Sequence, residues 1–418
     1  MTSLSRLGVA LAIVSFLGAG CLSNRPYGVS SSNPDEELLI NGMYSAPVKY
    51  RGMGYLVRPS DLVETGNDVK TISPLDNPKF VSISEARAED YLIDEIDGLV
   101  IYDGGKMLFF PEQILAWHEI VNFNIADEPM TVTFSPFTET AVAFSRSLYS
   151  GEIISLKRSG YAWNNNSVLY SPETGTMWLQ ANGLAIAGKN KVGEKMAVAN
   201  SAIMTFKDFE KKYPNGEVLS SATGFNRKYD VSPYGVYRES KAIYFPMATK
   251  PVKALNGKAF VYGVDVNGIF KAYEPGLLKD TGRGVKHDKV GDADIVVWVG
   301  EDGVLRAHES GDFVFSYPAA GGLKDRLGYV WMVDNATGDL VLGEKRLSGI
   351  STLKTFWFFW SAFHPDTELF AKVRGKGTVD GSPELKEGEG SEEVDGIKLD
   401  VDPSKFPTGN TKVEVETK

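Results

Sequence analysis

The sequence predicts an α+β protein, rich in β-strands, in which two tandem similar repeats pack around a pseudo-twofold axis. Three observations support this prediction. The 43 glycines and 20 prolines indicate many turns, and short strand-like segments alternate with only a few short helical segments. In addition, four segments of the first half recur, in the same order, in the second half.

The recurring segments can be read directly in the chain. IYDGGKMLFFPEQIL resembles GVDVNGIFKAYEPGLL, each with a strand, a glycine turn, a second strand and the start of a helix. EPMTVTF resembles ADIVVWV, and SPETGTMWLQANGLAIAG resembles VDNATGDLVLGEKRLSG, two hairpins that turn at Thr-Gly. MTFKDFEKKYPNGEVL resembles KTFWFFWSAFHPDTELF, where aromatic residues at helical spacing precede a proline that ends the helix. We therefore expect two copies of one α+β unit.

These segments divide the chain into six predicted parts. They are a signal peptide (1–20), a tether and lead-in (21–60), the first α+β repeat (61–225), a linker rich in Tyr and Pro (226–254), the second α+β repeat (255–372) and an acidic flexible tail (373–418). The tail has few large apolar residues, so it buries too little surface to offset its chain entropy. The two repeats would leave a cleft between them, and clefts at domain interfaces are favoured ligand sites.

The N-terminus has the order of residues that marks a secretory signal. Arg6 precedes an apolar run over residues 7–17, which is shorter than the roughly 20 residues of a spanning helix. Small residues follow at 18–20, and Cys21 comes next, where a bacterial lipoprotein is cut and lipidated. We expect secretion across the cytoplasmic membrane and a lipid on Cys21 that anchors the protein on the periplasmic or cell-surface side. An ordinary signal peptide with an incidental cysteine is the alternative.

Charge and composition exclude several functions. The formal net charge is −10 and the pI is near 5.2, with no block of Lys and Arg, so nucleic acid is not an expected partner. One cysteine cannot form an intramolecular disulfide, and four histidines make a multi-histidine metal site improbable. We predict no metal and no cofactor. The expected partners are the membrane, through the lipid on Cys21, and an unidentified small molecule or protein.

The segment FPEQILAWHEIVNFNI predicts a helix that begins at Pro111 and ends near Asn122. His118 falls on the apolar stripe of this helix instead of the solvent face. The stripe consists of Ile114, Trp117, His118 and Val121. A histidine there is either a site residue or a core residue satisfied by one backbone carbonyl. Glu119 and Asn122 follow it, and the helix leads into the strand that ends at the polar bend TFSPFTETA.

Four segments carry a resemblance to a known family. PLDNPKFVSISEA, EQILAWHEIVN, MTVTFSPFTETAVAF and FWSAFHPDTELF resemble the domain-of-unknown-function family 3179 (DUF3179) over about residues 74–370. Its members are secreted and lipid-anchored proteins of bacteria and archaea. Typical members carry Cys-Pro-Leu-Cys-Gly-Thr in the bend, whereas this chain has Ser-Pro-Phe-Thr-Glu-Thr over residues 135–140. The resemblance implies soft-metal or redox chemistry for the family's thiols, which Ser135 and Thr138 do not support.

Three function classes fit this sequence. The first is a non-catalytic ligand- or partner-binding lipoprotein. The second is a hydrolase-like enzyme in which His118 activates Ser135, with Glu119 or Glu139 orienting the imidazole. The third is a purely structural surface protein in which Ser135 and Thr138 only cap backbone groups. The sequence has no Gly-x-Ser-x-Gly nucleophile elbow around Ser135 to support the hydrolase-like enzyme. The predicted ligand-binding residues are Trp117, His118, Glu119, Asn122, Ser135, Thr138 and Thr140.

Overall fold

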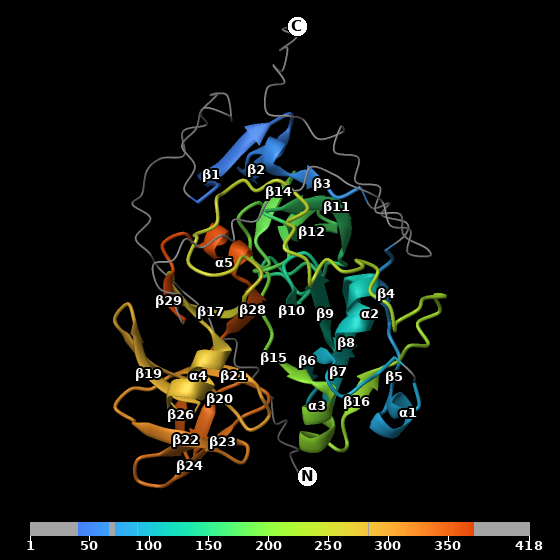
Figure 1. Cartoon of the computed structure of the whole chain (residues 1–418). Helices are drawn as coiled ribbons and strands as arrows, with labels where there is room; N and C mark the ends of the chain where they lie inside the picture. The colour runs from blue at the N-terminus through green and yellow to red at the C-terminus, as the bar shows by residue number, and fades with distance from the viewer. Residues whose placement is uncertain (1–40, 67–71, 90, 283, 372–418) are drawn as a thin grey trace, which may run out of the picture.

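The computed structural model describes residues 41–66, 72–89, 91–282 and 284–371. The predicted signal peptide, the predicted lipidation site Cys21 and the predicted flexible tail lie outside the described residues. Within these ranges, the helices are too short or too polar for any of them to cross a membrane. The described residues form six β-sheets and a few short helices, which confirms a β-rich α+β fold (Figure 1).

Three sheets belong to the first half of the chain. The seven-stranded sheet, in the order β1-β2-β14-β13-β12-β11-β3, contains β1 (Met43–Tyr50), β2 (Met53–Val57), β3 (Val63–Glu64), β11 (Lys157–Trp163), β12 (Asn166–Ser171), β13 (Thr176–Leu179) and β14 (Ala185–Gly188). The four-stranded sheet, in the order β10-β9-β8-β4, contains β4 (Leu75–Asp76), β8 (Ile120–Ile125), β9 (Glu128–Ser135) and β10 (Thr140–Ser145). The five-stranded sheet, in the order β15-β6-β7-β16-β5, contains β5 (Phe80–Ser82), β6 (Asp97–Tyr102), β7 (Met107–Pro111), β15 (Ser201–Thr205) and β16 (Glu217–Leu219).

The other three β-sheets belong to the second half of the chain. One sheet, in the order β28-β17-β18-β29, contains β17 (Phe260–Val266), β18 (Ile269–Tyr273), β28 (Thr352–Phe356) and β29 (Glu368–Phe370). Another, in the order β19-β20-β21-β27, contains β19 (Val285–Val290), β20 (Ala293–Val299), β21 (Leu305–Glu309) and β27 (Gly349–Ile350). The last, in sequential order, contains β22 (Phe315–Ala319), β23 (Gly322–Asp325), β24 (Val330–Val333), β25 (Leu340–Leu342) and β26 (Lys345–Leu347).

The helices are short, and their starts follow capping rules. Ser82 caps α1 through a reciprocal capping box with Glu85, and Thr205 caps α3 by accepting from the amide of Asp208. The helical segments are η1 (Pro59–Asp61), α1 (Ile83–Arg87), α2 (Glu112–His118), α3 (Phe206–Lys212), α4 (Pro275–Gly282) and α5 (Trp357–Phe363). The first four residues of α5, all of them aromatic, are buried, so this run belongs to the core.

The two halves have matching strand orders. The order β15-β6-β7-β16 in the first half corresponds to β28-β17-β18-β29 in the second, with the same sequence of antiparallel, antiparallel and parallel pairings. The hairpins predicted at Thr-Gly turn at Gly175 and Gly338, both with the positive φ that favours glycine. A common origin of the halves and a pseudo-twofold axis between them remain predictions.

Two segments assigned to connections contribute to the fold. Strands β1 and β2, within the predicted lead-in, extend the sheet of the first half through pairing with β14. The linker (226–254) inserts five residues into the largest hydrophobic cluster, which also contains Phe356 and Phe359 of the second half. The inserted residues are Tyr229, Tyr234, Tyr237, Ile243 and Phe245. The halves and the linker therefore share one core.

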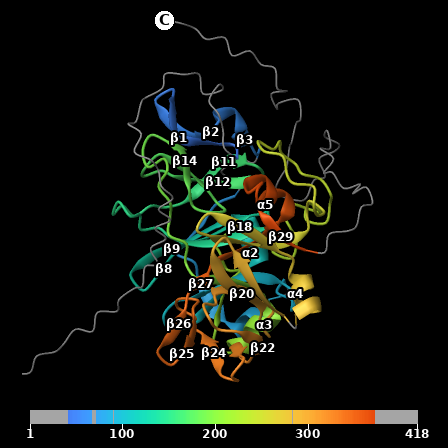
Figure 2. The same cartoon turned by 90° about the vertical axis from the view of Figure 1, so that its left-hand side faces the viewer.

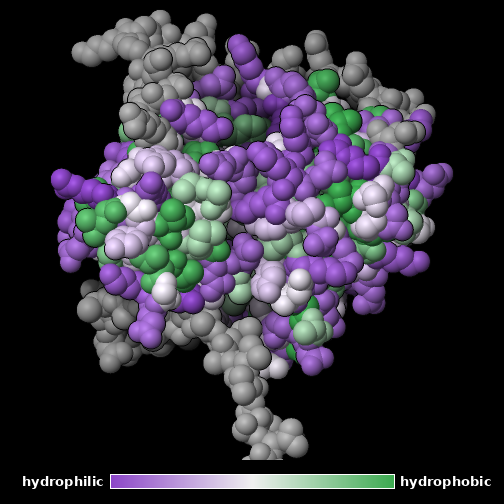
Figure 3. Space-filling view, turned by 90° about the horizontal axis from the view of Figure 1, so that it is seen from below, coloured by the Kyte–Doolittle hydropathy of each residue, from purple (hydrophilic) through white to green (hydrophobic). Residues whose placement is uncertain are grey.

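Two groups of strands lie at opposite ends of the molecule. Strands β1–β3 lie at one end and β22–β26 at the other, with α2 and β8–β10 between them, in both views (Figures 1 and 2). Seen from the end that holds β22–β24, hydrophilic side chains cover most of the surface, but hydrophobic ones gather over the left-hand lobe (Figure 3).

Candidate functional site

The predicted helix at residues 111–122 is shorter in the structure, and its end changes the interpretation of the motif. Helix α2 stops at His118, because Glu119 adopts a left-handed conformation with φ of 56° and its amide bonds to the carbonyl of Leu115. The chain then continues as β8, whose β-branched and aromatic residues favour a strand. The prediction that the helix extends to Asn122 is therefore wrong, and Val121 lies on a strand.

His118 is buried, and other groups occupy both of its ring nitrogens. Nδ1 lies 2.8 Å from the carbonyl oxygen of Ser73, and Nε2 lies 2.8 Å from the hydroxyl oxygen of Tyr229. Burial lowers the pKa of His118 to about 4, so the imidazole is neutral near pH 7. Its neighbours come from the linker and from the segment before β4, not from the bend.

Glu119 forms the centre of a buried ionic network. Its Oε2 lies 3.0 Å from Nε of Arg158 and accepts from the hydroxyl of Ser167 at 3.3 Å, while its Oε1 accepts from the hydroxyl of Tyr234. The amide of Ser167 donates to Oγ of Ser135 at 3.0 Å. The network therefore connects Glu119 and Ser135 through one residue of β12, and both side chains are fully enclosed.

The two threonines of the bend belong to a second network. Their hydroxyl oxygens lie 3.0 Å apart, and Nδ2 of Asn166 donates to Thr138 at 2.9 Å and to Thr140 at 3.1 Å. Thr140 also donates to Oε1 of Gln180. The carbonyl of Thr138 accepts from the amide of Phe356 on β28, so the bend is attached to the second half of the chain.

The remaining predicted residues have structural partners too. The indole of Trp117 donates to the carbonyl of Val231 at 2.9 Å, which fixes the linker against α2. Nδ2 of Asn122 donates to Asp76 at 2.8 Å and to the carbonyl of Leu156 at 3.1 Å. All seven predicted site residues are buried, and none of them lines either pocket described below.

The positions of these residues do not support a hydrolase site at Ser135 and His118. The hydrolase alternative needs a hydrogen bond between His118 and Ser135, and the ring nitrogens of His118 are instead engaged by Ser73 and Tyr229. Ser135 is enclosed, so no water or substrate reaches its hydroxyl in this conformation. In the described part of the chain, no group of three His, Cys, Asp or Glu side chains is placed to hold a metal ion.

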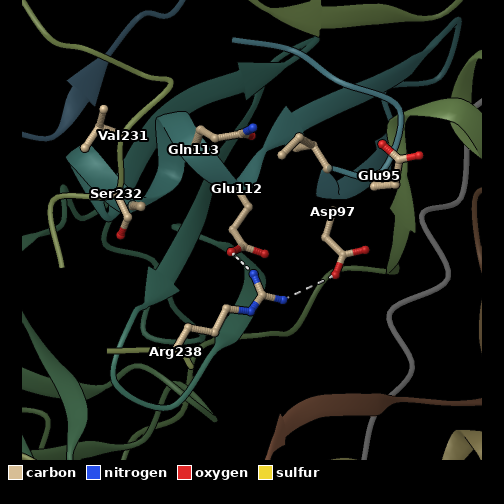
Figure 4. Close-up of a pocket in the computed structure, with 9 residues that line it drawn as sticks. Glu95, Asp97, Glu112, Gln113, Val231, Ser232 and Arg238 are labelled. Atoms are coloured by element: carbon tan, nitrogen blue, oxygen red, sulfur yellow. Dashed lines mark hydrogen bonds and ion pairs between the residues drawn. The ribbon is translucent and has the colours of Figure 1, made fainter. Parts of the chain in front are cut away.

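A charged pocket opens on the other side of α2. It has a volume of about 130 Å³ and is bordered by α2, the start of β6 and linker residues 231–238 (Figure 4). In Figure 4 the guanidinium of Arg238 lies between the carboxylates of Glu112 and Asp97, with Glu95 beside Asp97. The lining is Glu95, Ile96, Asp97, Glu112, Gln113, Ala116, Val231, Ser232 and Arg238.

A chain of alternating charges continues from this pocket toward the second half. Arg238 lies 2.5 Å from Glu112, 3.5 Å from Glu139 and 3.8 Å from Asp97. Lys354 of β28 lies 2.5 Å from Asp97. Asp97 and Glu112 also line a smaller adjacent pocket together with Glu139 and Lys354. The charged groups thus come from α2, β6, the bend, the linker and the second half.

Burial perturbs the carboxyl groups of this cluster. It raises the pKa of Glu139 to about 8, the neighbouring Glu112 raises it further, and Arg238 acts in the opposite direction. Burial also raises the pKa of Glu112, against the lowering effect of Arg238. Two acidic groups with raised pKa values that share one guanidinium, beside a pocket, make this cluster the strongest candidate site in the described residues.

The comparison with family models identifies the family. The model described as "Protein of unknown function (DUF3179)" matches residues 70–367. The chain belongs to the DUF3179 family. No curated protein matches it, and no solved structure does.

Membership of DUF3179 clarifies the bend. Glu139 occupies the place where the family pattern quoted above has glycine, and it has φ of 53°, a conformation that glycine adopts without strain. The carboxylate of Glu139 points into the charged cluster, where it lies 3.5 Å from Arg238. The two hydroxyls at the thiol positions, in contrast, belong to buried networks.

Sequence reasoning missed most of the pocket. Asp97, Glu112 and Arg238 lie far apart in the chain and in no recognisable motif, and Arg238 was assigned to a linker. One signal was available: Glu139, a non-glycine residue where the family pattern has glycine, marks the one position of the bend that introduces a charge.

Proposed function

We propose that this DUF3179 protein is an extracytoplasmic, lipid-anchored protein that binds a small organic cation without catalysis, in the pocket beside Arg238. One observation carries the proposal: three carboxylates, Glu95, Asp97 and Glu112, line a pocket in which Arg238 is the one cationic lining residue. Lys354 pairs with Asp97 from outside the pocket, and the two other carboxylates still outnumber Arg238. This excess favours a ligand with an amine or guanidine.

The size of the pocket restricts the ligand. Pockets for drug-sized molecules have volumes of roughly 300–1,000 Å³. At about 130 Å³ this pocket suits a compact molecule. Arg238 has a half-buried side chain, and movement of its guanidinium away from Glu112 would free that carboxylate for the ligand's cationic group. A Lys or Arg side chain of a protein partner has the same chemistry and is the alternative occupant that the experiment below distinguishes.

The other two function classes have less support. Catalysis by Ser135 would require it to leave an enclosed position in which it accepts from the amide of Ser167. A purely structural role accounts for the buried networks of His118, Glu119 and Thr138, but it does not explain the charged pocket. The pocket lies where the first half meets the linker, and Lys354 of the second half contacts its lining residue Asp97. Ligand sites are common at such junctions.

Binding is tested by titrating the protein with a series of small amines and guanidines in a calorimeter. We expect Glu112→Gln to weaken binding of the best cation by about tenfold or more, since a charged hydrogen bond contributes roughly 1.5–3 kcal/mol. Glu152→Gln, which removes a carboxylate bound to Lys191 in a different part of the fold, should leave affinity unchanged. An affinity that is the same in both variants would exclude the pocket, and binding only to basic peptides would favour the protein partner.

The predicted anchor has its own test. We expect the mature chain to begin at Cys21 and to carry a lipid, because Cys21 directly follows the small residues after the apolar run. Intact-mass measurement on membrane-extracted protein should show the lipid, and Cys21→Ser should be released in soluble form. An unmodified N-terminus at another residue would refute the lipoprotein assignment.

A further inference from the structure

The sheet β22–β26 has one buried and one exposed face. Leu323, Trp331 and Leu340 are fully buried against the neighbouring sheet. The strand register places Tyr317 and Met332 on the opposite face, where they are 39% and 46% exposed. Both side chains are therefore accessible to solvent. Figure 3 views the molecule from the end that holds β22–β24.

The loop that joins β23 to β24 extends the exposed apolar surface. Leu327 is 82% exposed and Tyr329 is 58% exposed. The loop is nonetheless held in one conformation by Asp325, whose Oδ1 accepts from the amides of both residues at 2.9 Å. Oδ2 of Asp325 accepts from the indole of Trp331 at 3.1 Å. The protein therefore fixes a leucine and a tyrosine in solvent, an arrangement without benefit to the isolated fold.

The charged side chains beside this tip are cations. Lys324 lies 5.3 Å from the ring of Tyr317, and Arg326 is exposed next to Leu327. The one carboxylate within the loop, Asp325, is buried and uses both oxygens for the hydrogen bonds described above. A protein with net charge −10 thus presents a locally basic and apolar tip.

We propose that this hairpin tip, formed by residues 324–329 with Tyr317 and Met332, docks on an anionic phospholipid surface. The tip is a loop whose leucine and tyrosine are exposed beside cations, and such a loop suits insertion into an anionic bilayer interface. Tyrosine favours the interface because its ring is apolar and its hydroxyl polar. Lys324 and Arg326 complement anionic headgroups. The proposal rests on neither the charged pocket nor the lipid on Cys21.

Vesicle flotation tests the proposal. The chain from residue 21, carrying Cys21→Ser so that no lipid can be attached, is mixed with vesicles of phosphatidylcholine alone or with about a third phosphatidylglycerol. We expect binding to the anionic vesicles and a decrease of about tenfold for Leu327→Glu. The double change Lys324→Gln, Arg326→Gln should reduce binding by about thirtyfold at low salt, since each cation contributes on the order of 1 kcal/mol, or about fivefold.

A matched control separates the tip from exposed apolar residues in general. Ile153 is 59% exposed and lies in a different part of the fold, so Ile153→Glu should leave flotation unchanged. Melting temperatures of all variants should agree within a few degrees, because Leu327 and Ile153 are exposed. Equal losses in Leu327→Glu and Ile153→Glu, or no flotation of the parent chain, would overturn the proposal. So would a dimer in solution that Leu327→Glu dissociates while flotation is unaffected.

Discussion

Replacing Glu119 with alanine is expected to lower the free energy of unfolding by about 3–5 kcal/mol, because removal of one partner leaves a buried charge uncompensated. The side chain of Arg158 is only 4% exposed, and Glu119 is the carboxylate bound to it. The same substitution removes the acceptor for the hydroxyls of Tyr234 and Ser167. Chemical unfolding followed by circular dichroism measures the change.

Two further variants test whether the uncompensated charge of Arg158 causes this loss of stability. Glu217→Ala removes a carboxylate whose partner, Lys106, is half exposed, so it should change stability by about 1 kcal/mol or less. Replacing both partners, Glu119→Leu with Arg158→Met, should recover part of the loss, because no unpaired charge remains. If Glu119→Ala is no more destabilising than Glu217→Ala, the network does not hold the fold, and Glu119 becomes a candidate ligand-binding residue again.

The sequence predicted the fold class because local signals agree with it. Short strand-like segments, Thr-Gly turns and helix-ending prolines are short-range features, and the structure has the corresponding hairpins and short helices. The burial of His118 follows equally from its place among apolar residues. Its environment was not predictable in detail, since Tyr229 and the carbonyl of Ser73 lie far from it in the chain.

The end of α2 illustrates a limit of helical spacing. Residues 114, 117, 118 and 121 fit a helix, yet the chain turns at Glu119 by adopting a left-handed conformation. A glutamate does not predict such a turn, because glycine and asparagine are the usual residues with a left-handed conformation at the end of a helix. Tertiary contacts stabilise the turn: the side chain of Glu119 is fixed by Arg158 and Tyr234.

The candidate site was less predictable than the fold. Ser135 and Thr138 were predicted as site residues because they are hydroxyls in a polar bend, but their hydrogen bonds with Ser167 and Asn166 hold β12 against the bend. The pocket depends on long-range pairings between Glu112, Asp97 and Arg238. Such pairings leave no periodicity in the sequence. Only Glu139, where the family pattern has glycine, indicated that the bend contributes a charge.

Replacing Glu139 with glutamine is expected to make the protein more stable at high pH and to leave it almost unchanged at low pH. Burial, assisted by Glu112, raises the pKa of Glu139 from 4.5 to about 8. The folded protein therefore binds an extra proton between those pH values, and the free energy of unfolding falls as pH rises from about 4.5 to about 8. Glutamine has nearly the same shape and does not ionise.

Stability measured from pH 4 to pH 9 should thus decline less steeply in Glu139→Gln than in the parent chain. We expect a gain of up to about 5 kcal/mol at pH 9, because the pKa is raised from 4.5 to about 8 and each unit of pKa shift corresponds to about 1.4 kcal/mol. Glu139→Gly is the matched variant: it also removes the carboxylate, and it relieves the left-handed backbone at φ of 53°, an effect independent of pH. The two variants should therefore differ by a constant across the pH range. Parallel profiles for the parent chain and Glu139→Gln would mean that Glu139 is ionised throughout, as a carboxylate fully paired with Arg238 would be.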